Sequence, residues 1–420
     1  MKYFIAILLS INLFIPQTAS AVRLWSSGLE LQSATSAVEF DGQSGTGISI
    51  NTTTYRSGAA ALRVVRSGTA GTSYVFQQYG GSAGVDNNFV RIYVYIVTAP
   101  SANTTILELN NYNDQGTNAS IYLKTDRTLQ LTYYAGSGGA HQQNIGSVSS
   151  ALALNTWYRI EVNYNGTNTA SVNIEALLNG TSFASQTGIT DAIDAGIVGR
   201  IYWGIDAGAW GGAEVATADL YFDDFAINDG TGTAQNSYAG AGSVVHMHPD
   251  SAGDAAATLG LFSAVDEVTP NDATDYVEQD TIAAFNYNFE ASSVRGIGAS
   301  DTITLVQIGT RQHPETAAAA AWTPQIKSQS GGTTTSGTST THNDTTWRTN
   351  GDVEPRNYAL TSYTDPQAGG AWTPALLNTM IAGVNVTDAT PNMFFSTIWA
   401  LIEYIPSIIT YTAPPIVFEE

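Results

Sequence analysis

The sequence predicts an all-β protein built from two β-sandwich domains in tandem, with one short helix in the second. The 420 residues contain many short runs rich in Val, Ile, Tyr or Thr, each bounded by Gly, Asn, Asp or Ser. Forty glycines and only 12% charged residues favour tight turns over helices. Residues 230–243 are low in bulky side chains, and we expect them to be a linker between two series of strands.

The charge balance excludes several classes of partner. Fifteen Lys and Arg against 36 Asp and Glu give a formal net charge of −21, and the sequence contains no basic stripe. Nucleic acids and anionic membrane surfaces are therefore not expected as partners. Between Asn228 and Val294 there is no Lys or Arg while acidic residues accumulate, which either keeps the surface solvated or binds divalent cations.

The amino terminus predicts export. Lys2 precedes an apolar run of about 13 residues, too short to span a bilayer, and Ala-Ser-Ala at residues 19–21 is a cleavage motif. We expect residues 1–21 to be a signal peptide and the mature chain to begin near Val22, with no membrane insertion after cleavage. The expected localisation is extracellular, or on the surface of a virion. The chain has no cysteine, so its stability has to come from its cores and from any bound ions.

Residues 22–229 are expected to form the first domain. Ten runs fit the pattern of strands, at residues 60–65, 74–78, 88–97, 105–109, 119–123, 129–133, 157–164, 170–178, 200–205 and 219–227. No convincing helix lies between them, which predicts a two-sheet antiparallel sandwich. Asn165-Gly166 and Asn179-Gly180 predict hairpin turns, because both residue types tolerate a positive φ.

Several motifs in this domain belong together. They are the run Asn-Thr-Trp-Tyr-Arg-Ile-Glu-Val, the two Asn-Gly turns after it, and the segments 28–30, 55–63 and 222–227. In these motifs the domain resembles the concanavalin A-like, laminin-G-like jelly rolls over residues 22–229. That fold hosts lectins, carbohydrate-binding modules, adhesion domains and glycosidases, so the resemblance implies a fold rather than a function.

The resemblance also implies a role for two acidic residues. In similar carbohydrate-binding jelly rolls an acidic residue near the start and an aspartate in the closing strand often share a structural Ca²⁺ ion, and Glu30 and Asp223 fit those places. The alternative is that Asp223 accepts backbone N–H bonds from a turn. Strand alternation puts Asp223 on the face of Phe225 and Ile227, and it sends Asp224 outward into solvent.

Aromatic side chains of the first domain are candidates for stacking on sugar rings. Trp210 lies in the glycine-rich stretch 207–212, and Tyr133 and Tyr134 lie at the end of a predicted strand. For Trp210, packing against a neighbouring loop is an equal alternative. The expected partner is an extracellular glycan or a cell-surface polysaccharide.

The sequence shows no pattern of catalytic residues. Retaining glycosidases of this fold place paired acids on one strand face, but E-x-D-x-E is absent, and Asp223 and Asp224 are adjacent and so face opposite ways. No G-x-S-x-G, Walker or G-x-G-x-x-G motif occurs, so we expect no cofactor beyond structural Ca²⁺. His246-x-His248 offers either two ligands to a metal ion or two surface histidines on a first strand.

Residues 244–408 are expected to form the second domain, followed by a tail at 409–420. Strands are predicted at residues 276–278, 283–289, 302–311, 322–327, 358–363 and 392–404. Thr373 as a cap, Pro374 in the first turn and Gly383 as a stop predict a helix over residues 375–382. The runs 265–277, 370–374 and 382–384 resemble a β-rich domain of structural proteins of tailed bacteriophages.

These features predict a non-enzymatic, secreted or virion-surface protein with a structural or adhesive role, whose first domain binds glycans. One alternative is a polysaccharide-acting glycosidase or lyase of the concanavalin A-like fold. Another is a purely structural element of a particle or surface layer, for which assembly into a homo-oligomer is expected.

Overall fold

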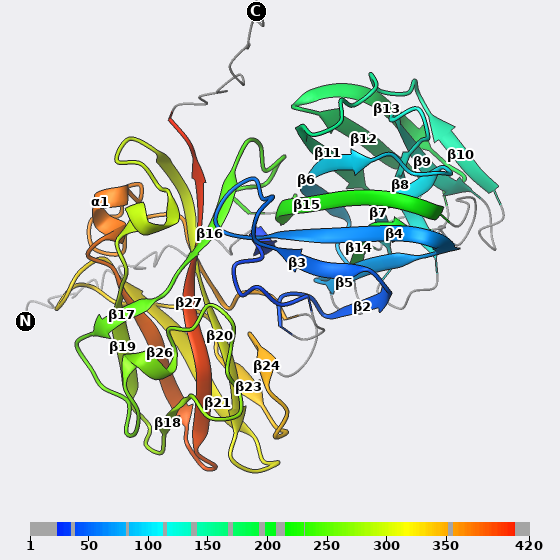
Figure 1. Cartoon of the computed structure of the whole chain (residues 1–420). Coiled ribbons are helices and arrows are strands. Elements are labelled where there is room, and N and C mark those ends of the chain that lie inside the picture. The colour runs from blue at the N-terminus through cyan, green and yellow to red at the C-terminus, as the bar shows by residue number, and fades with distance from the viewer. Residues whose placement is uncertain are drawn as a thin grey trace, which may run out of the picture.

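The computed structural model describes residues 23–407 except 35–37, 81–83, 112–115, 136–140, 167–170, 193–197, 207–214, 231 and 352–355. The described chain consists mainly of strands, which confirms the predicted all-β class, and these form four antiparallel sheets in two pairs (Figure 1). One pair is formed by strands up to Asp229, and the other by strands from Ser243 onward. No helix among the described residues is long and apolar enough to cross a membrane.

The first half of the molecule contains two sheets, which we call sheets A and B. Sheet A has the order β13 (Thr181–Ile189), β12 (Val172–Leu178), β11 (Trp157–Asn165), β6 (Asn87–Thr98), β15 (Val215–Asp229), β4 (Ala61–Gly71) and β3 (Ile48–Asn51), with β1 (Arg23–Ser27) paired to β15. Sheet B has the order β10 (His141–Ile145), β9 (Leu129–Ala135), β8 (Thr117–Leu123), β7 (Thr104–Asn110), β14 (Arg200–Asp206), β5 (Ser73–Gln78) and β2 (Gly42–Gly45). The two sheets enclose one apolar core, to which both contribute.

The second half contains sheets C and D. Sheet C has the order β16 (Ser243–Met247), β27 (Met393–Ile405), β20 (Thr302–Pro314) and β24 (Arg348–Thr349), with β18 (Val277–Gln279) paired to β27 and β25 (Leu360–Ser362) paired to β20. Sheet D has the order β17 (Pro249–Ala252), β19 (Ala284–Phe289), β26 (Ile381–Asp388), β21 (Ala320–Lys327) and β22 (Thr335–Ser336), with β23 (Thr340–His342) paired to β21. A second apolar core lies between these sheets.

The α-helix found among the described residues, α1 (Pro374–Leu377), is shorter than predicted. Its cap is the predicted one, because the Thr373 hydroxyl accepts a hydrogen bond of 3.2 Å from the third helical N–H. The expected continuation to residue 382 does not form, since β26 already begins at Ile381. Gly383 lies inside β26, where a Cβ atom would come within 2.1 Å of the Phe285 carbonyl oxygen. This glycine therefore allows two strands to approach closely and does not end the helix.

The closing strand of the first half, β15, carries a β-bulge at Asp223 and Asp224. Between its pairing positions β15 has one residue more than β6, and Asp224 takes a φ of 51°. Phe222 and Phe225 both lie in the core. Two predictions fail because of this bulge: Asp223 does not share the face of Phe225, and Asp224 is completely buried instead of exposed to solvent.

A buried charged cluster joins the two halves. Glu403 of β27 pairs with Arg23 of β1 at 2.9 Å and with Arg91 of β6 at 2.6 Å, and all three side chains are buried. Asp224 accepts a hydrogen bond of 2.6 Å from the backbone N–H of Val244. A third apolar cluster lies beside these groups and comprises Leu31, Val244, Leu305, Trp399 and Leu401. The two halves therefore share a buried interface rather than a flexible connection alone.

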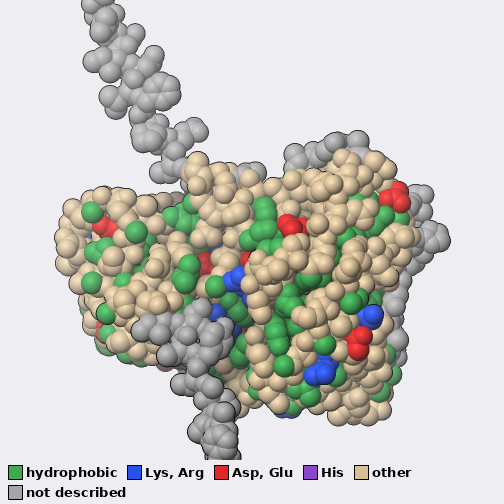
Figure 2. Space-filling model, turned by 90° about the horizontal axis from the view of Figure 1, so that it is seen from above, with side chains coloured by type: hydrophobic (Ala, Val, Ile, Leu, Met, Phe, Trp, Pro, Cys, Tyr) green, Lys and Arg blue, Asp and Glu red, His purple; other side chains and the backbone are tan. Residues whose placement is uncertain are grey.

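The surface carries few charges. Figure 2 shows one face on which uncharged polar side chains and backbone atoms predominate, with hydrophobic and charged side chains scattered among them. This sparse distribution agrees with a chain in which only 12% of residues are charged. The charged side chains of the described residues form no large patch on this face.

Candidate functional site

The outer face of sheet B carries polar residues at alternate positions of its central strands. In β14 the side chains of Ile201, Trp203 and Ile205 fill the core, so Arg200 and Tyr202 point the other way. In β7 the same alternation buries Leu107 and Leu109 in the core and turns Glu108 and Asn110 outward. We call the outward residues Gln78, Glu108, Asn110, Thr117, Arg200 and Tyr202 the polar face of sheet B.

Strand register arranges the polar face in rows. Arg200 lies opposite Gln78 of β5 on one side and opposite Asn110 of β7 on the other. Tyr202 lies opposite Phe76 and Glu108 in the next row. Directly opposed residues have Cβ atoms about 5 Å apart. Side chains of three neighbouring strands therefore converge on one small area.

A guanidinium and a phenol are in contact at the centre of this area. One terminal nitrogen of Arg200 donates a hydrogen bond of 2.9 Å to the Tyr202 hydroxyl. The guanidinium carbon also lies 4.8 Å from the centre of the Phe76 ring. A guanidinium at this distance stabilises negative charge that develops on the phenol oxygen during a proton transfer.

Aromatic rings enclose one side of this pair. The Tyr74 and Tyr202 rings meet edge to face with centroids 5.2 Å apart. Gly204 makes room for this contact: its φ is 143°, and an added Cβ atom would lie 2.4 Å from the Ser73 carbonyl oxygen and 3.1 Å from Cβ of Tyr74. The rings fix the position of the Tyr202 side chain, which is only 6% exposed.

A carboxylate occupies the other side. Glu108 accepts hydrogen bonds from the Asn110 amide at 3.1 Å and from the Thr117 hydroxyl at 2.6 Å. Glu108 and Asn110 are each only 4% exposed. The Glu108 carboxylate therefore orients the Asn110 amide, which lies beside Arg200 in the first row. Sequence reasoning missed this group, although the alternation of Leu with Glu and Asn in β7 carries the signal.

The two tyrosines expected to bind glycans lie on opposite faces of β9. Tyr134 lies on the outer face but is completely buried, with its hydroxyl 3.3 Å from that of Tyr122, and burial raises its pKa. Tyr133 belongs to the core, and its hydroxyl donates a hydrogen bond of 3.1 Å to Asp191. Neither ring presents a flat surface to a ligand, so both ligand predictions need correction. Trp210, the third, lies outside the described residues.

The predicted metal ligands Glu30 and Asp223 meet at the turn before β4. Glu30 accepts a hydrogen bond of 2.8 Å from the Ala59 N–H, and Asp223 accepts one of 2.7 Å from the Arg56 N–H. Asp223 also accepts a bond of 2.7 Å from the N–H of Asp224. These bonds are those of the alternative role, in which Asp223 anchors a turn.

Glu30 and Asp223 supply only part of the coordination shell that a Ca²⁺ ion needs. Both carboxylates are buried, and neither forms an ion pair within the part of the chain that the structure describes. Burial raises the pKa of Glu30 to about 8, and Oε2 of Glu30 has no hydrogen-bond partner among the described atoms. Two ionised carboxylates would balance the charge of a Ca²⁺ ion. The ion is coordinated by six to eight oxygen atoms, however, and two carboxylates have only four between them. No set of three or more acidic or histidine side chains suited to a metal occurs in the described ranges.

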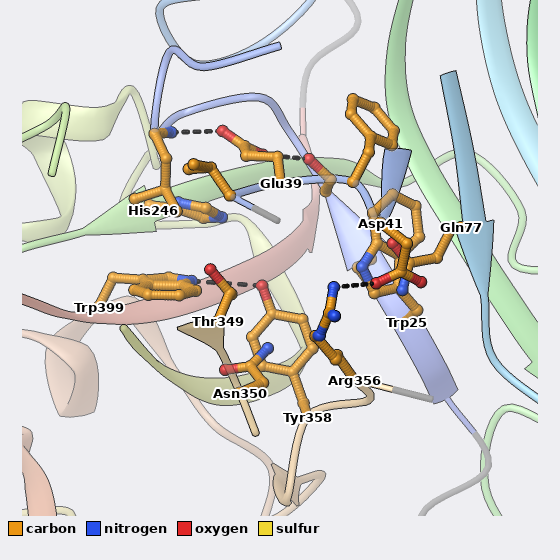
Figure 3. A pocket seen from close by; sticks show the side chains of 15 residues that line it. Trp25, Glu39, Asp41, Gln77, His246, Thr349, Asn350, Arg356, Tyr358 and Trp399 are labelled. Atoms are coloured by element: carbon orange, nitrogen blue, oxygen red, sulfur yellow. Dashed lines mark hydrogen bonds and ion pairs between the residues drawn. The ribbon is translucent and has the colours of Figure 1, made fainter. Parts of the chain in front are cut away.

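A small hollow lies between the two halves (Figure 3). Its lining includes Glu39 and Asp41 from the first half and His246, Tyr358 and Trp399 from the second. It has room for about a single water molecule, which is too little for a sugar unit. The hollow is therefore not a substrate site, and on the polar face of sheet B the partly exposed Arg200 is reachable from solvent.

The histidines of the His246-x-His248 motif are not at the surface. Both are buried, and the His246 ring stacks on the Trp399 ring with centroids 5.6 Å apart. Burial lowers the pKa of His246, so the ring is neutral at ordinary pH. The two imidazole centroids are 6.5 Å apart. His246 is thus part of the interface between the halves, and because both rings are buried the surface alternative is wrong.

The sequence matches no protein-family model and no curated protein. Similar solved structures include an endo-β-1,4-glucuronan lyase from the fungus Trichoderma reesei, with 12% identity, 49% of this chain and 95% of that chain covered, and a TM-score of 0.39. They also include a carbohydrate esterase of the Shiga toxin-encoding bacteriophage phi24B (17%, 49% and 97%, TM-score 0.35) and an alginate lyase from Chlorella virus (13%, 46% and 93%, TM-score 0.34).

These matches correct one expectation. The chain was expected not to be an enzyme, whereas the similar structures just given are two lyases and an esterase, all named as carbohydrate-directed enzymes. The expectation of a non-enzymatic protein is therefore contradicted. The resemblance of the second half to phage virion domains stays a prediction.

Proposed function

We propose that the polar face of sheet B binds a polysaccharide chain and cleaves it by β-elimination at a uronate unit. The observation that carries this proposal is the hydrogen bond between Arg200 and Tyr202, at the centre of a face that also holds Asn110 and Glu108. Hydrolysis needs two carboxyl groups that flank the scissile bond. In the two central rows of the described face, Glu108 is the one carboxylate.

Elimination requires three tasks, and the polar face has a residue for each. The uronate carboxylate pairs with the Arg200 guanidinium and accepts a hydrogen bond from the Asn110 amide, which makes the neighbouring C5 proton more acidic. The Tyr202 oxygen takes this proton in its deprotonated form, whose negative charge Arg200 stabilises. The C5 electron pair forms the C4–C5 double bond, the C4–O bond breaks, and the Tyr202 hydroxyl returns the proton to the leaving oxygen. Glu108 positions Asn110 and does not touch the reacting atoms.

The test is cleavage of defined polyuronates by the full chain. Polyglucuronate, alginate and pectate are incubated with the protein, and ultraviolet absorbance reports the new double bond conjugated to the carboxylate. The Tyr202→Phe variant should lose about 10²- to 10⁴-fold in rate, the range typical of a lost acid–base group. Tyr55→Phe is the matched control, because Tyr55 is an exposed tyrosine of the same half.

Two outcomes would overturn the proposal. Reducing ends that appear without a rise in absorbance would mean hydrolysis, and a variant Tyr202→Phe as active as the wild type would remove the residue from the reaction. Failure to cleave any of the three polymers, in a preparation shown to be folded, would reject β-elimination of uronates altogether.

Two further expectations belong to this proposal. The protein acts outside the cell or on a virion surface, on an extracellular or cell-surface polysaccharide, after removal of residues 1–21. The sequence of secreted material, determined from its amino terminus, should begin near Val22.

We also infer that a structural Ca²⁺ ion is held by Glu30 and Asp223. The unpartnered Oε2 atom of Glu30 supports the ion, whereas the backbone hydrogen bonds of Asp223 favour a turn anchor.

A further inference from the structure

Among the described residues, the first half covers the outer face of sheet C around the end of β27 that holds Trp399, Leu401 and Glu403. Along β27, the outward residues Trp399 and Leu401 lie in the apolar cluster between the halves, and Glu403 pairs with the arginines of the first half. Phe394, at the start of β27, lies on the same outer face, since Met393 and Phe395 on either side of it are in the core. β18 pairs with this start of β27 (Figure 1).

Four rings gather beside this start of β27. His313 of β20 lies directly opposite Phe394, with ring centroids 5.1 Å apart. Trp347 meets the His313 ring at 4.3 Å, and Tyr276 meets the Phe394 ring at 5.0 Å. Tyr276 and Trp347 lie 6.2 Å apart and close the group. We call Tyr276, His313, Trp347 and Phe394 the ring cluster.

The ring cluster is reachable from solvent. Tyr276 is 39% exposed, and the other three side chains are partly exposed. Burial lowers the pKa of His313, so its ring is uncharged at neutral pH and presents an apolar surface like the others. The cluster contains aromatic rings but no aliphatic side chain. Rings that combine an apolar face with a polar edge suit ligands that are themselves apolar on one side and polar on the other.

Polar pairs lie beside the rings. The Asn392 amide donates a hydrogen bond of 2.7 Å to Glu278, which is opposite Phe394 in the register. Arg311, two residues before His313, holds the carboxylate of Asp272 through nitrogen–oxygen contacts of 2.5 to 3.0 Å. Such fixed amide, carboxylate and guanidinium groups can bond the hydroxyl groups of a sugar whose C–H face rests on the rings.

We propose that the ring cluster is a second polysaccharide-binding site, which anchors the protein to a long chain at a distance from the polar face of sheet B. Its chemistry is that of a sugar platform, with aromatic faces in the middle and hydrogen-bonding pairs at the rim. This site goes beyond the proposed cleavage reaction, because it binds without bond breaking and lies on a different sheet. A protein partner or a second copy of the chain is the competing occupant.

The test is affinity electrophoresis of the full chain in native gels that contain alginate, polyglucuronate, xylan or mixed-linkage β-glucan. At least one polymer should retard the wild type. Trp347→Ala and Tyr276→Ala should each weaken the dissociation constant about tenfold, as truncation of an aromatic anchor does. Tyr276→Phe should bind like the wild type, because it keeps the ring, and so should the control Tyr55→Ala, which removes an exposed ring elsewhere.

Three outcomes would overturn the proposal of a second binding site. It is overturned if no polymer retards the wild type, or if folded Trp347→Ala and Tyr276→Ala migrate like the wild type in every gel. A change in molar mass on light scattering between wild type and Trp347→Ala would assign the cluster to self-association instead. Tyr202→Phe should keep its retardation, so a failure of the cleavage reaction and a failure of this binding site are told apart.

Discussion

Replacing Glu39 with glutamine should remove a large part of the pH dependence of the stability of the fold. Glu39 lies in the lining of the hollow between the halves (Figure 3) and is 7% exposed. It accepts hydrogen bonds from the Leu31 N–H at 2.5 Å and from the Ser27 hydroxyl, and it has no ion pair within the described chain. Burial raises the pKa of Glu39 from 4.5 to about 7.

The size and sign of the effect follow from this shift. A rise from 4.5 to about 7 corresponds to about 3 kcal/mol, at about 1.36 kcal/mol per pKa unit. Because the folded state has the higher pKa, it binds more protons than the unfolded state between these two values. The free energy of unfolding therefore falls by about 3 kcal/mol as the pH rises from about 4.5 to above about 7.

The assay is urea unfolding of wild type and Glu39→Gln at about pH 5 and about pH 8.5. Glutamine keeps the shape and the hydrogen bonds of the protonated acid and carries no charge. The variant should match the wild type at the lower pH and exceed it by up to about 3 kcal/mol at the higher pH. Glu30, whose pKa is raised by burial and in smaller part by the charge of Glu39, titrates in both proteins, so most of its contribution cancels in the difference.

One result would refute this reasoning. If Glu39→Gln loses stability between the two pH values as steeply as the wild type, the carboxyl group is not the buried acid that the geometry describes. Glu315→Gln is the matched control, because Glu315 is exposed and its removal should leave the pH dependence unchanged.

Three further predictions concern stability. Glu403→Gln should lower the free energy of unfolding by about 3–5 kcal/mol, because Arg23 and Arg91 lose their buried counter-charge; a loss below about 1 kcal/mol in urea titrations would contradict this. If Glu30 and Asp223 hold Ca²⁺, the ion at about 100 times its dissociation constant should add about 2.7 kcal/mol, and Asp223→Asn should abolish the response; identical melting with EDTA and with calcium would dismiss the ion. Gly204→Ala should destabilise by more than about 1 kcal/mol, since its positive φ and the carbonyl at 2.4 Å leave no room for a methyl group; wild-type melting would contradict the close strand packing.

Sequence patterns predicted strands well because alternation is a local signal. The run Arg-Ile-Tyr-Trp-Gly-Ile-Asp of β14 places Ile201, Trp203 and Ile205 in the core as its period of two requires. The helix after Pro374 has correct capping signals, but its length depends on where β26 pairs, which is a tertiary contact. Local patterns therefore located elements better than they located element ends.

The candidate site could not be predicted from the same alternation of inward and outward residues. Outward residues such as Glu108 and Asn110 read as the solvated side of a strand, and nothing in the sequence says which strands are neighbours. Only the register of β7 with β14 brings these residues beside Arg200 and Tyr202. The bulge that buries Asp224 was equally invisible, because it depends on an extra residue counted against a partner strand.

The Glu403 cluster has a consequence for cooperativity. Arg23 and Glu403 come from the first and the last strands of the described chain, so the contact between them closes the molecule. Until β27 is in place, two arginines of the first half lack the carboxylate that neutralises them, and desolvating them alone is unfavourable. The halves should therefore melt in one transition rather than two, although their cores are separate. β27 couples them, because loss of Glu403 from its place leaves the two buried arginines of the first half without a counter-charge.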